Sequence, residues 1–320
     1  MEEMKRPRLL VIGGGRLGQH HTRILAGMPS VELVGICDIN QKVVAELSRK
    51  YQIAGYTDYQ IAWDKVRPDA VIIATPTPTH YEIARFFLGN QVHCLVEKPL
   101  TTEVQQADEL ISLSHQGNLI LQVGHVERFN SAVLAAEEFI HQPKFIEVNR
   151  LGPFSERMDM VGVVLDLMIH DIDIVLHLLR SVNPADRVIS LEAIGARVLT
   201  ETEDIAKVRL KFSSGCWVDL SASRISLEKY RHIRIFQPDS YISIDYAGPA
   251  LKIYRKKKPR IEKLSDIEII RPRLPKEEPL AKELQSFVNC LITGQEPLVK
   301  GEHGRNALEL AQEILRQLNV

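Results

Sequence analysis

Four titratable side chains recur at helical spacing in the mostly apolar stretch 163–177. Asp166, His170, Asp173 and His177 stand at i, i+4, i+7 and i+11, so on a helix they form one stripe. A histidine titrates near neutral pH and a neighbouring carboxylate can orient it, which suits a general base. Two other interpretations stay open: the solvated edge of an amphipathic helix, and a metal site built from Asp and His. Because no cysteine or further histidine completes a ligand set, we expect no metal.

A lysine that could assist this base follows the apolar segment Val92–Val96, where the chain reads Glu97-Lys98-Pro99. An ordinary salt link at the end of a strand would also explain these charges. Oxidation of a secondary alcohol needs a base for the hydroxyl proton while hydride leaves the carbon for a nicotinamide. A lysine can hydrogen-bond the alcohol or stabilise developing negative charge on its oxygen. We therefore predict that Lys98, Asp166 and His170 are catalytic and contact the substrate, and that Glu97 and Lys98 also contact the cofactor.

A glycine fingerprint for a dinucleotide follows the first apolar run, Arg8–Ile12. Gly13, Gly15 and Gly18 satisfy GxGxxG, and a helical pattern begins at Arg16. The first glycine permits a tight turn, the second lets backbone approach a pyrophosphate, and the third lets the helix pack on the strand. A plain glycine-rich turn is the alternative. The residues that we predict to bind the cofactor here are Gly13, Gly15, Arg16, Leu17 and Gly18.

The choice of cofactor rests on Asp38, which lies 20 residues after Gly18 at the end of the second apolar run. A carboxylate at this point accepts hydrogen bonds from the adenosine ribose and repels a 2′-phosphate, and no arginine follows it. NAD is therefore expected rather than NADP. A further loop, 75–80, follows the third strong strand, and Thr75, Pro76 and His80 are predicted cofactor contacts, with a rigid turn capped by Thr79 as the alternative.

Strands and helices alternate strictly through the first 124 residues, which predicts a doubly wound parallel sheet of the Rossmann type. Expected strands are Arg8–Ile12, Glu32–Cys37, Ala70–Ala74, Val92–Val96 and Leu119–Val123. Expected helices are Arg16–Ala26, Asn40–Tyr51, Thr79–Leu88 and one capped by Thr101 or Thr102 that runs to about His115. We assign residues 1–124 to an NAD-binding domain.

After Gly124 the runs become those of neighbouring strands, several with alternating apolar and polar residues. This pattern predicts an α+β domain with a large, mostly antiparallel sheet that has one wet face. Expected strands are Phe145–Leu151, Ile189–Val198, Ile205–Phe212, Cys216–Ala222, His232–Phe236, Tyr241–Tyr246, Leu251–Tyr254 and Ile267–Ile270. Expected helices are Val163–Leu179, Glu278–Ile292 and Gly304–Leu318, and the basic run 255–258 is expected in a turn. We assign residues 125–320 to substrate binding and oligomerisation.

Composition excludes several classes of partner. The chain has 320 residues, 45% of them apolar and 25% charged, with a net charge of −1. So small a charge attracts neither nucleic acid nor an anionic membrane surface. The four cysteines form no CxxC pair, the N-terminus lacks the apolar core of a signal peptide, and no apolar run approaches the ~20 residues that span a bilayer. We expect a cytoplasmic protein with reduced thiols.

The order of these motifs resembles one family of oxidoreductases. A glycine fingerprint, then Glu97-Lys98-Pro99, then Asp166-x-x-x-His170-x-x-Asp173 is similar to the glucose-fructose oxidoreductase, inositol dehydrogenase and MocA family (Gfo/Idh/MocA). The resemblance covers essentially the whole chain. It implies a Rossmann domain, a second domain whose open sheet serves for oligomerisation as a homodimer or homotetramer, and Lys98, His170 and Asp166 as lysine, acid/base and assisting carboxylate.

A narrower resemblance points to the substrate. Residues 124–130 and 150–157 resemble the branch of UDP-N-acetylglucosamine 3-dehydrogenases, whose 3-keto product an aminotransferase aminates for lipid A variants. This implies a nucleotide sugar oxidised at its 3-hydroxyl, with Arg128, Arg150 and Arg157 available for the phosphates. We predict Arg128 and Arg157 as substrate contacts, and surface or interdomain salt links are the alternative. Another sugar or inositol, reduction of an imine or tetrapyrrole, and a non-catalytic NAD-binding regulator remain alternative functions.

The first testable prediction concerns Asp38. Replacing Asp38 with serine removes the charge that repels a 2′-phosphate, so the preference for NADH over NADPH should narrow. Dissociation constants of the purified protein for NADH and NADPH measure this preference. Tighter binding of NADPH by the unmodified chain would contradict the prediction.

Overall fold

The computed structural model describes residues 6–154 and 161–318. Contacts divide the chain into two compact units. Unit 1 comprises residues 1–126 and 278–308, and unit 2 comprises residues 127–277 and 309–320. The predicted boundary at 124 lies two residues from the first break between the units, but no sequence pattern indicated that residues 278–308 pack with the N-terminal part.

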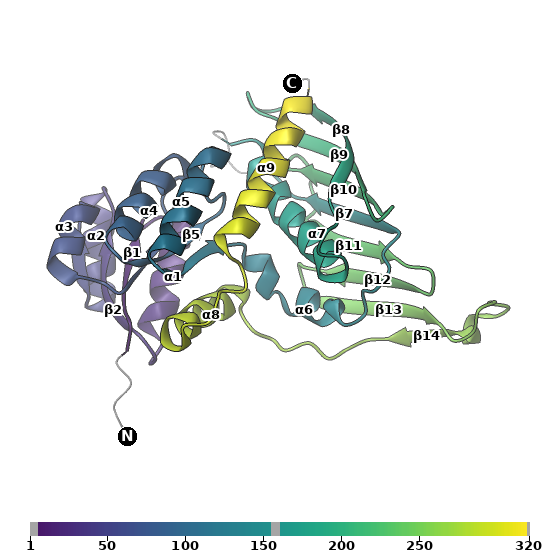
Figure 1. Cartoon of the computed structure of the whole chain (residues 1–320), viewed down its shortest axis with the longest axis horizontal. Helices are drawn as coiled ribbons and strands as arrows, with labels where there is room; N and C mark the ends of the chain where they lie inside the picture. The colour runs from purple at the N-terminus through teal and green to yellow at the C-terminus, as the bar shows by residue number, and fades with distance from the viewer. Residues whose placement is uncertain (1–5, 155–160, 319–320) are drawn as a thin grey trace. The chain divides into compact units, whose positions relative to one another are not determined.

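Unit 1 is built on a six-stranded parallel sheet, as the alternation of strands and helices predicts (Figure 1). Its strands are β1 Arg8–Ile12, β2 Glu32–Cys37, β3 Ala54–Tyr56, β4 Ala70–Ile73, β5 His93–Glu97 and β6 Leu121–Gly124. Their order is β3-β2-β1-β4-β5-β6. The order reverses direction between β1 and β4, and such a switch point is where doubly wound sheets bind ligands, beyond the carboxyl ends of the strands.

Two elements of unit 1 escaped prediction, and one helix begins elsewhere than expected. The helices are α1 Arg16–Ala26, α2 Gln41–Tyr51, α3 Tyr59–Val66, α4 His80–Gly89, α5 Val104–Gln116, α8 Pro279–Thr293 and the first half of α9 Gly301–Gln317, whose residues from 309 onward belong to unit 2. Strand β3 has three residues, too few for a periodic signal, and α3 follows it at once. Helix α5 is capped by Glu103 and Gln106 in a capping box, not by Thr101 or Thr102, because Thr101 bonds the Glu103 carbonyl instead.

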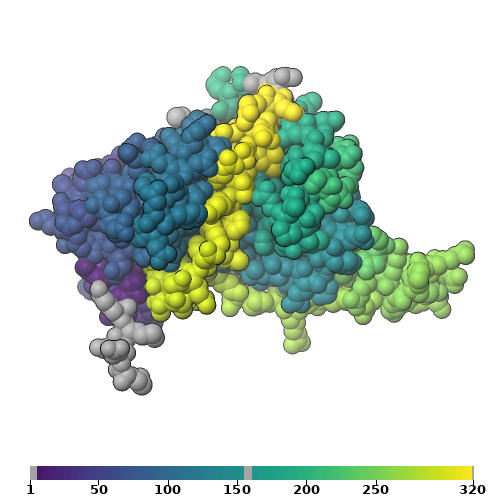
Figure 2. All heavy atoms as spheres, in the orientation of Figure 1, coloured from purple at the N-terminus to yellow at the C-terminus, as the bar shows by residue number. Residues whose placement is uncertain are grey.

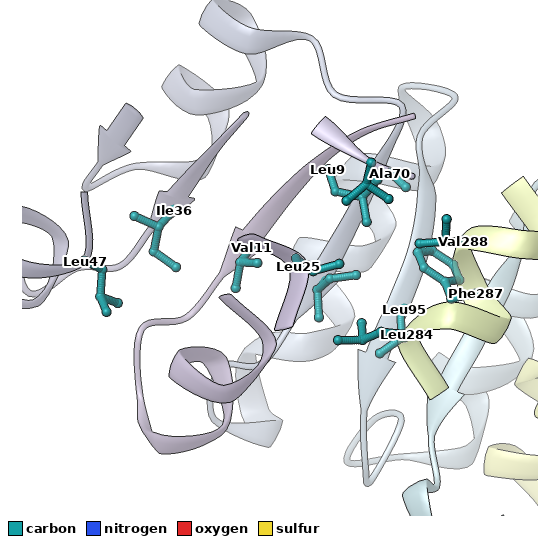
Figure 3. Packing of buried hydrophobic residues seen from close by; sticks show 12 residues of the cluster. Leu9, Val11, Leu25, Ile36, Leu47, Ala70, Leu95, Leu284, Phe287 and Val288 are labelled. Carbon is teal, nitrogen blue, oxygen red and sulfur yellow. The ribbon is translucent and has the colours of Figure 1, made fainter. Parts of the chain in front are cut away.

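One apolar cluster joins the sheet of unit 1 to α1, α2 and α8. Leu9, Val11 and Leu95 of the strands pack with Leu284 and Phe287 of α8, and all five side chains are fully buried (Figure 3). Helix α9 is fixed in the same unit through its first turns, which lie against α5 (Figure 2). Arg305 Nε donates to Asp108 Oδ1 at 3.0 Å, and His115 and Glu302 form a second pair across these helices. The late segment 278–308 therefore completes the core of the first unit.

Unit 2 carries an eight-stranded sheet in the order β14-β13-β12-β11-β7-β10-β9-β8. Every neighbouring pair is antiparallel except β7 with β10, which confirms the mostly antiparallel prediction. The strands are β7 Phe145–Leu151, β8 Val188–Ala196, β9 Ile205–Phe212, β10 Trp217–Ser223, β11 Tyr230–Phe236, β12 Ser240–Asp245, β13 Ala250–Lys256 and β14 Ile267–Ile270. The basic run expected in a turn begins inside β13, since Arg255 and Lys256 end that strand.

Helices cover one face of this sheet (Figure 1). They are α6 Ser131–Glu137, a π-helical turn at Val164–Met168 and α7 Ile169–Val182, and the second half of α9 also belongs to this unit. Strand β9 shows the consequence, because its residues alternate between exposed and buried along the strand. Among the described residues no helix covers the opposite face, whose side chains remain partly accessible. None of the described helices is both long and apolar enough to cross a membrane.

Candidate active site

The glycine loop after β1 has a geometry that only glycine satisfies at two of its three fingerprint positions. Gly13 has φ +99°, and a Cβ there would lie 2.4 Å from the Ala74 carbonyl oxygen. A Cβ on Gly18 would lie 1.8 Å from the Gly13 carbonyl oxygen, so α1 could not pack so closely with any other residue. A Cβ on Gly15 would meet no atom within 4 Å. The open space at Gly15 lies at the N-terminus of α1, where backbone N–H groups suit a phosphate.

Asp38 is held at the end of β2 beside this loop. Its Oδ2 accepts a hydrogen bond of 2.6 Å from the Gly14 N–H, and its Oδ1 accepts one of 2.7 Å from the Asn40 N–H. Each carboxylate oxygen has a second lone pair, which leaves acceptor capacity for ribose hydroxyls. Arg16 and Leu17 are exposed in the first turn of α1. The loop and Asp38 therefore fit a dinucleotide with an unphosphorylated adenosine ribose.

The loop after β4 is braced by His80, which is 1% exposed. One ring nitrogen of His80 lies 2.8 Å from the Thr75 carbonyl oxygen and the other lies 2.8 Å from the Pro99 carbonyl oxygen. This histidine thus ties the 75–80 loop to the segment that carries Lys98. Thr79 does not cap α4 with its side chain but bonds Thr75 and Pro76 within the loop. Cofactor contacts by Thr75, Pro76 and His80 stay predictions.

The side chains of Glu97 and Lys98 differ in burial and in partners. Lys98 is half-buried, whereas Glu97 is 5% exposed and its Oε1 lies 2.7 Å from His21 Nε2. Its Oε2 accepts a hydrogen bond from the Lys98 N–H at 3.3 Å, which fixes the backbone that carries the lysine side chain. Gly124 gives this carboxylate room, because a Cβ there would lie 2.7 Å from Glu97 Oε2.

A second buried acid that sequence reasoning missed is Glu283 of α8. Its side chain is 0% exposed, and within the described part of the chain neither of its carboxylate oxygens has a hydrogen-bond partner. Burial, followed by the charge of Glu97, raises the pKa of Glu283 well above its ordinary value. A signal was present in the sequence, since Glu283 stands on the apolar face of its helix, between Leu280 and Phe287.

The predicted catalytic residues of unit 2 lie where a π-helical turn meets an α-helix. Asp166 belongs to the turn Val164–Met168, and His170 is the second residue of α7. Both are half-buried, so each has an accessible side as well as a packed one. Such π-turns often occur at functional sites because they re-aim side chains. The segment was predicted as one uninterrupted helix, and this turn is the difference.

The lower part of the predicted stripe has a structural role instead. Asp173 accepts two hydrogen bonds from Arg128, at 2.7 and 3.3 Å, and both side chains are 2% exposed. His177 Nε2 lies 2.9 Å from Glu137 Oε1 of α6. The guanidinium of Arg128, predicted as a substrate contact, is therefore directed at α7, and its contact with substrate stays a prediction. Arg157 lies outside the described residues.

A parallel ion pair joins α7 to the middle of the sheet. Arg150 of β7 donates to both oxygens of Asp171 at 2.8 Å, and a third hydrogen bond of 3.1 Å reaches Glu127 Oε1. Burial raises the pKa of Asp171, and the Arg150 charge opposes this rise. Sequence reasoning missed Asp171 and Glu127, and it also missed Arg231 of β11, which lies 3.9 Å from Glu127 Oε1. No local spacing connects these four residues along the chain.

The described residues form no cluster of metal ligands. Among the residues that the structure describes, no three His, Cys, Asp or Glu side chains are grouped so that they could hold a metal ion. The four cysteines are buried free thiols, and burial raises the pKa of Cys37 to about 12 and that of Cys216 to about 12. Thiols with such raised pKa values are poor nucleophiles and poor metal ligands.

Comparisons with known proteins agree with this architecture. Residues 8–125 match a model described as an oxidoreductase family with an NAD-binding Rossmann fold, and residues 136–242 match the GFO/IDH/MocA C-terminal domain. The UDP-N-acetylglucosamine 3-dehydrogenase of Acidithiobacillus ferrooxidans is 32% identical over 309 residues, which cover 95% of each protein. A solved structure of that dehydrogenase from the same organism has TM-score 0.89 at 30% identity and covers 98% of both chains. Myo-inositol 2-dehydrogenase of Thermotoga maritima is 25% identical over 97% of this chain and 96% of its own length.

The matched models and the fold define the class first: the protein is an NAD-dependent oxidoreductase with an N-terminal Rossmann unit. Its enzyme type is that of dehydrogenases acting on CH–OH groups. More particularly, the chain belongs to the GFO/IDH/MocA family, and the resemblance inferred from its motifs is confirmed.

The raised pKa of Glu283 gives a prediction about stability. The folded chain holds this proton more tightly than the unfolded chain, so the stabilisation is complete below about pH 4 and is lost as the pH rises toward the folded pKa. Glu283→Gln keeps a neutral side chain at every pH. The difference in free energy of unfolding between the variant and the wild type should therefore shift in favour of the variant, by roughly 1 kcal/mol for each pH unit above about pH 5. Urea unfolding across that range measures the difference.

The matched control for this experiment is Glu278→Gln at the start of the same helix. Glu278 is half-exposed and pairs with Arg23, so its replacement should change stability by an amount that does not grow with pH above about 5. If the difference for Glu283→Gln were equally independent of pH, Glu283 would be ionised in the folded protein and the prediction would be wrong.

Proposed function

We propose that this enzyme oxidises the 3-hydroxyl of UDP-N-acetylglucosamine, with NAD as hydride acceptor. The observation that carries the proposal is the likeness over 95% of the chain to a UDP-N-acetylglucosamine 3-dehydrogenase, in a chain that has Lys98, Asp166 and His170. A nucleotide sugar also agrees with the resemblance of residues 124–130 and 150–157. The product would be a 3-keto sugar, a reactive ketone that an aminotransferase could consume.

Within this proposal each predicted residue has a definite task. NAD, when bound, supplies the carbon that accepts the hydride. The Gly13–Gly18 loop and the N-terminus of α1 would hold the pyrophosphate, and Asp38 would hold the adenosine ribose. His170 takes the hydroxyl proton, and Asp166, one helical turn before it, orients the imidazole and stabilises its protonated form. Lys98 donates a hydrogen bond to the same oxygen as negative charge develops there.

A second candidate is oxidation of a free polyol such as myo-inositol. It is favoured by the 25% identity to the Thermotoga maritima enzyme over 97% of this chain. A polyol carries no phosphate, so it would need no cation outside the catalytic group.

We also propose that the reaction takes place in the cytoplasm, because all four cysteines are buried free thiols.

The experiment that tests the proposal is a coupled assay. Formation of NADH should be seen with UDP-N-acetylglucosamine when an aminotransferase and an amino donor remove the ketone, because the oxidation alone favours the alcohol. Free N-acetylglucosamine, glucose and myo-inositol form the comparison set. Turnover of a free sugar or of inositol, with none of the UDP-sugar, would leave only the general dehydrogenase activity standing.

Variants of the catalytic residues supply the control. Lys98→Met and His170→Asn should fold and bind NADH as the wild type does, while turnover falls by about 10²–10⁴-fold, the usual contribution of a positioned acid or base. Near-normal turnover by His170→Asn across neutral pH would show that another residue is the base. Addition of a chelator should leave activity unchanged.

We also propose that copies of this chain associate through the uncovered face of the eight-stranded sheet. Phe145, Phe236, Tyr241 and Tyr254 stack there in a continuous row, with ring centroids 5.6, 5.0 and 5.4 Å apart. Rows of partly exposed aromatic rings are typical of protein interfaces. Phe236 is 37% exposed as the row stands in one copy.

Sedimentation of the purified protein tests this association. A homodimer or homotetramer is expected, and replacing Phe236 and Tyr254 by glutamate should shift it to monomer, because burying two unpaired charges is costly. Leu227→Glu, at a loop residue that is 98% exposed, is the matched control and should leave the assembly intact. A wild-type monomer would contradict the proposal.

A further inference from the structure

In the described part of unit 2, Arg128, Arg150 and Arg231 belong to the polar layer between α7 and the sheet, and the first two are buried in ion pairs. Arg128 and Arg150 each make two hydrogen bonds to an aspartate of α7. Their side chains are 2% and 3% exposed. Because both side chains are almost completely buried, few of their remaining N–H donors are accessible from outside.

The third, Arg231, stands on the neighbouring strand directly opposite Arg150 in the register of β7 and β11. Residues paired in this way project from the same face of a sheet, so Arg231 lies on the helix-covered face. Its side chain is nonetheless 42% exposed. Among the described residues its charged partner is Glu127, at 3.9 Å, which is longer than a hydrogen bond.

Glu127 does not depend on Arg231 for its hydrogen bonds. Its Oε1 accepts from Arg150 Nη1 at 3.1 Å and its Oε2 accepts from Asn130 Nδ2 at 3.3 Å. Arg231 can therefore turn its N–H donors elsewhere without leaving a buried carboxylate unsatisfied. Burial and the Arg150 charge lower the pKa of Arg231, yet a guanidinium stays protonated at neutral pH.

Arg231 is also close to the predicted catalytic group. Arg150, directly opposite it on β7, bonds both oxygens of Asp171, and Asp171 follows His170 directly in α7. A cation with accessible donors beside a catalytic residue is placed to contact the substrate of that residue. A guanidinium binds phosphate with two parallel hydrogen bonds, which gives orientation as well as affinity.

We propose that Arg231 binds a phosphate group of the substrate and so selects a nucleoside diphosphate sugar over an uncharged polyol. The role rests on the proposed function in one respect, the presence of a phosphate in the substrate. Arg128 and Arg150 then serve to hold α7 and Glu127 in place around it. The residue that discriminates between substrates is thus a half-exposed arginine of β11.

Binding of UDP alone, measured by calorimetry in the presence of NADH, tests this role without relying on turnover. Charge-assisted hydrogen bonds are worth roughly 10- to 100-fold in affinity, so Arg231→Gln should raise the dissociation constant of UDP by about that factor. Arg231→Lys should fall between, because lysine keeps the charge but loses the two-pronged geometry. The affinity for NADH should not change, and the loss in kcat/KM for UDP-N-acetylglucosamine should fall mainly on KM.

Arg255→Gln is the matched control, since Arg255 of β13 is also half-exposed and pairs with Glu268 of β14. It should bind UDP as the wild type does. Should Arg231→Gln fail to fold, as judged by circular dichroism, Arg231→Lys carries the test alone.

The possible outcomes separate this inference from the proposed function. Equal UDP affinity in the wild type and the Arg231 variants, or no UDP binding by the wild type, overturns the role of Arg231 even if the UDP-sugar is oxidised. Loss of UDP binding in Arg231→Gln, in an enzyme that does not oxidise UDP-N-acetylglucosamine, supports the phosphate site and refutes only that substrate.

Discussion

The buried pairing of arginines with the aspartates of α7 is the constraint on which unit 2 depends. Two arginines, Arg150 of β7 and Arg128 of the turn before α6, contact this helix. Each donates two hydrogen bonds to one of its aspartates. Removing charges from water is costly, so such pairs add little to stability. Breaking one of them, however, leaves an unpaired charge in the interior. These four hydrogen bonds restrict rotation and sliding of α7 over the sheet. His170 lies on the same helix, so the same ion pairs also fix the position of its backbone.

Unit 1 fixes the glycine loop, its predicted cofactor site, by a different means, which is close packing of the backbone. Gly18 against Gly13, and Gly13 against Ala74, bring three chain segments nearer than any side chain permits. The carboxylate of Asp38 then bonds the loop at Gly14. Below Lys98, His21 and Glu97 form a buried contact of 2.7 Å that anchors the backbone of that residue. The half-buried Lys98, a predicted catalytic residue, thus follows a buried polar contact.

Local patterns were enough to predict most of the fold, whereas long-range contacts were not. The glycine fingerprint and Asp38 follow rules that hold within one strand-turn-helix unit, so their neighbourhood could be expected. Alternating burial likewise predicted β9 and its neighbours. Arg150 and Asp171 meet only because β7 lies under α7, and Arg128 meets Asp173 across 45 residues, although its charge suggested a ligand. The return of α8 to the first unit has no local signal, since its apolar face would suit either unit.

That return has a consequence for how the polypeptide is made. A ribosome makes the strands of the first sheet early, but Leu284 and Phe287, which pack with Leu9 and Leu95, are made only after the described strands of both sheets. Until then the nascent Rossmann sheet exposes an apolar face, while all the strands of the second sheet are already available. Unit 2 in turn takes residues 309–320, so each unit acquires its last packing segment only after all the described strands of both sheets have been made.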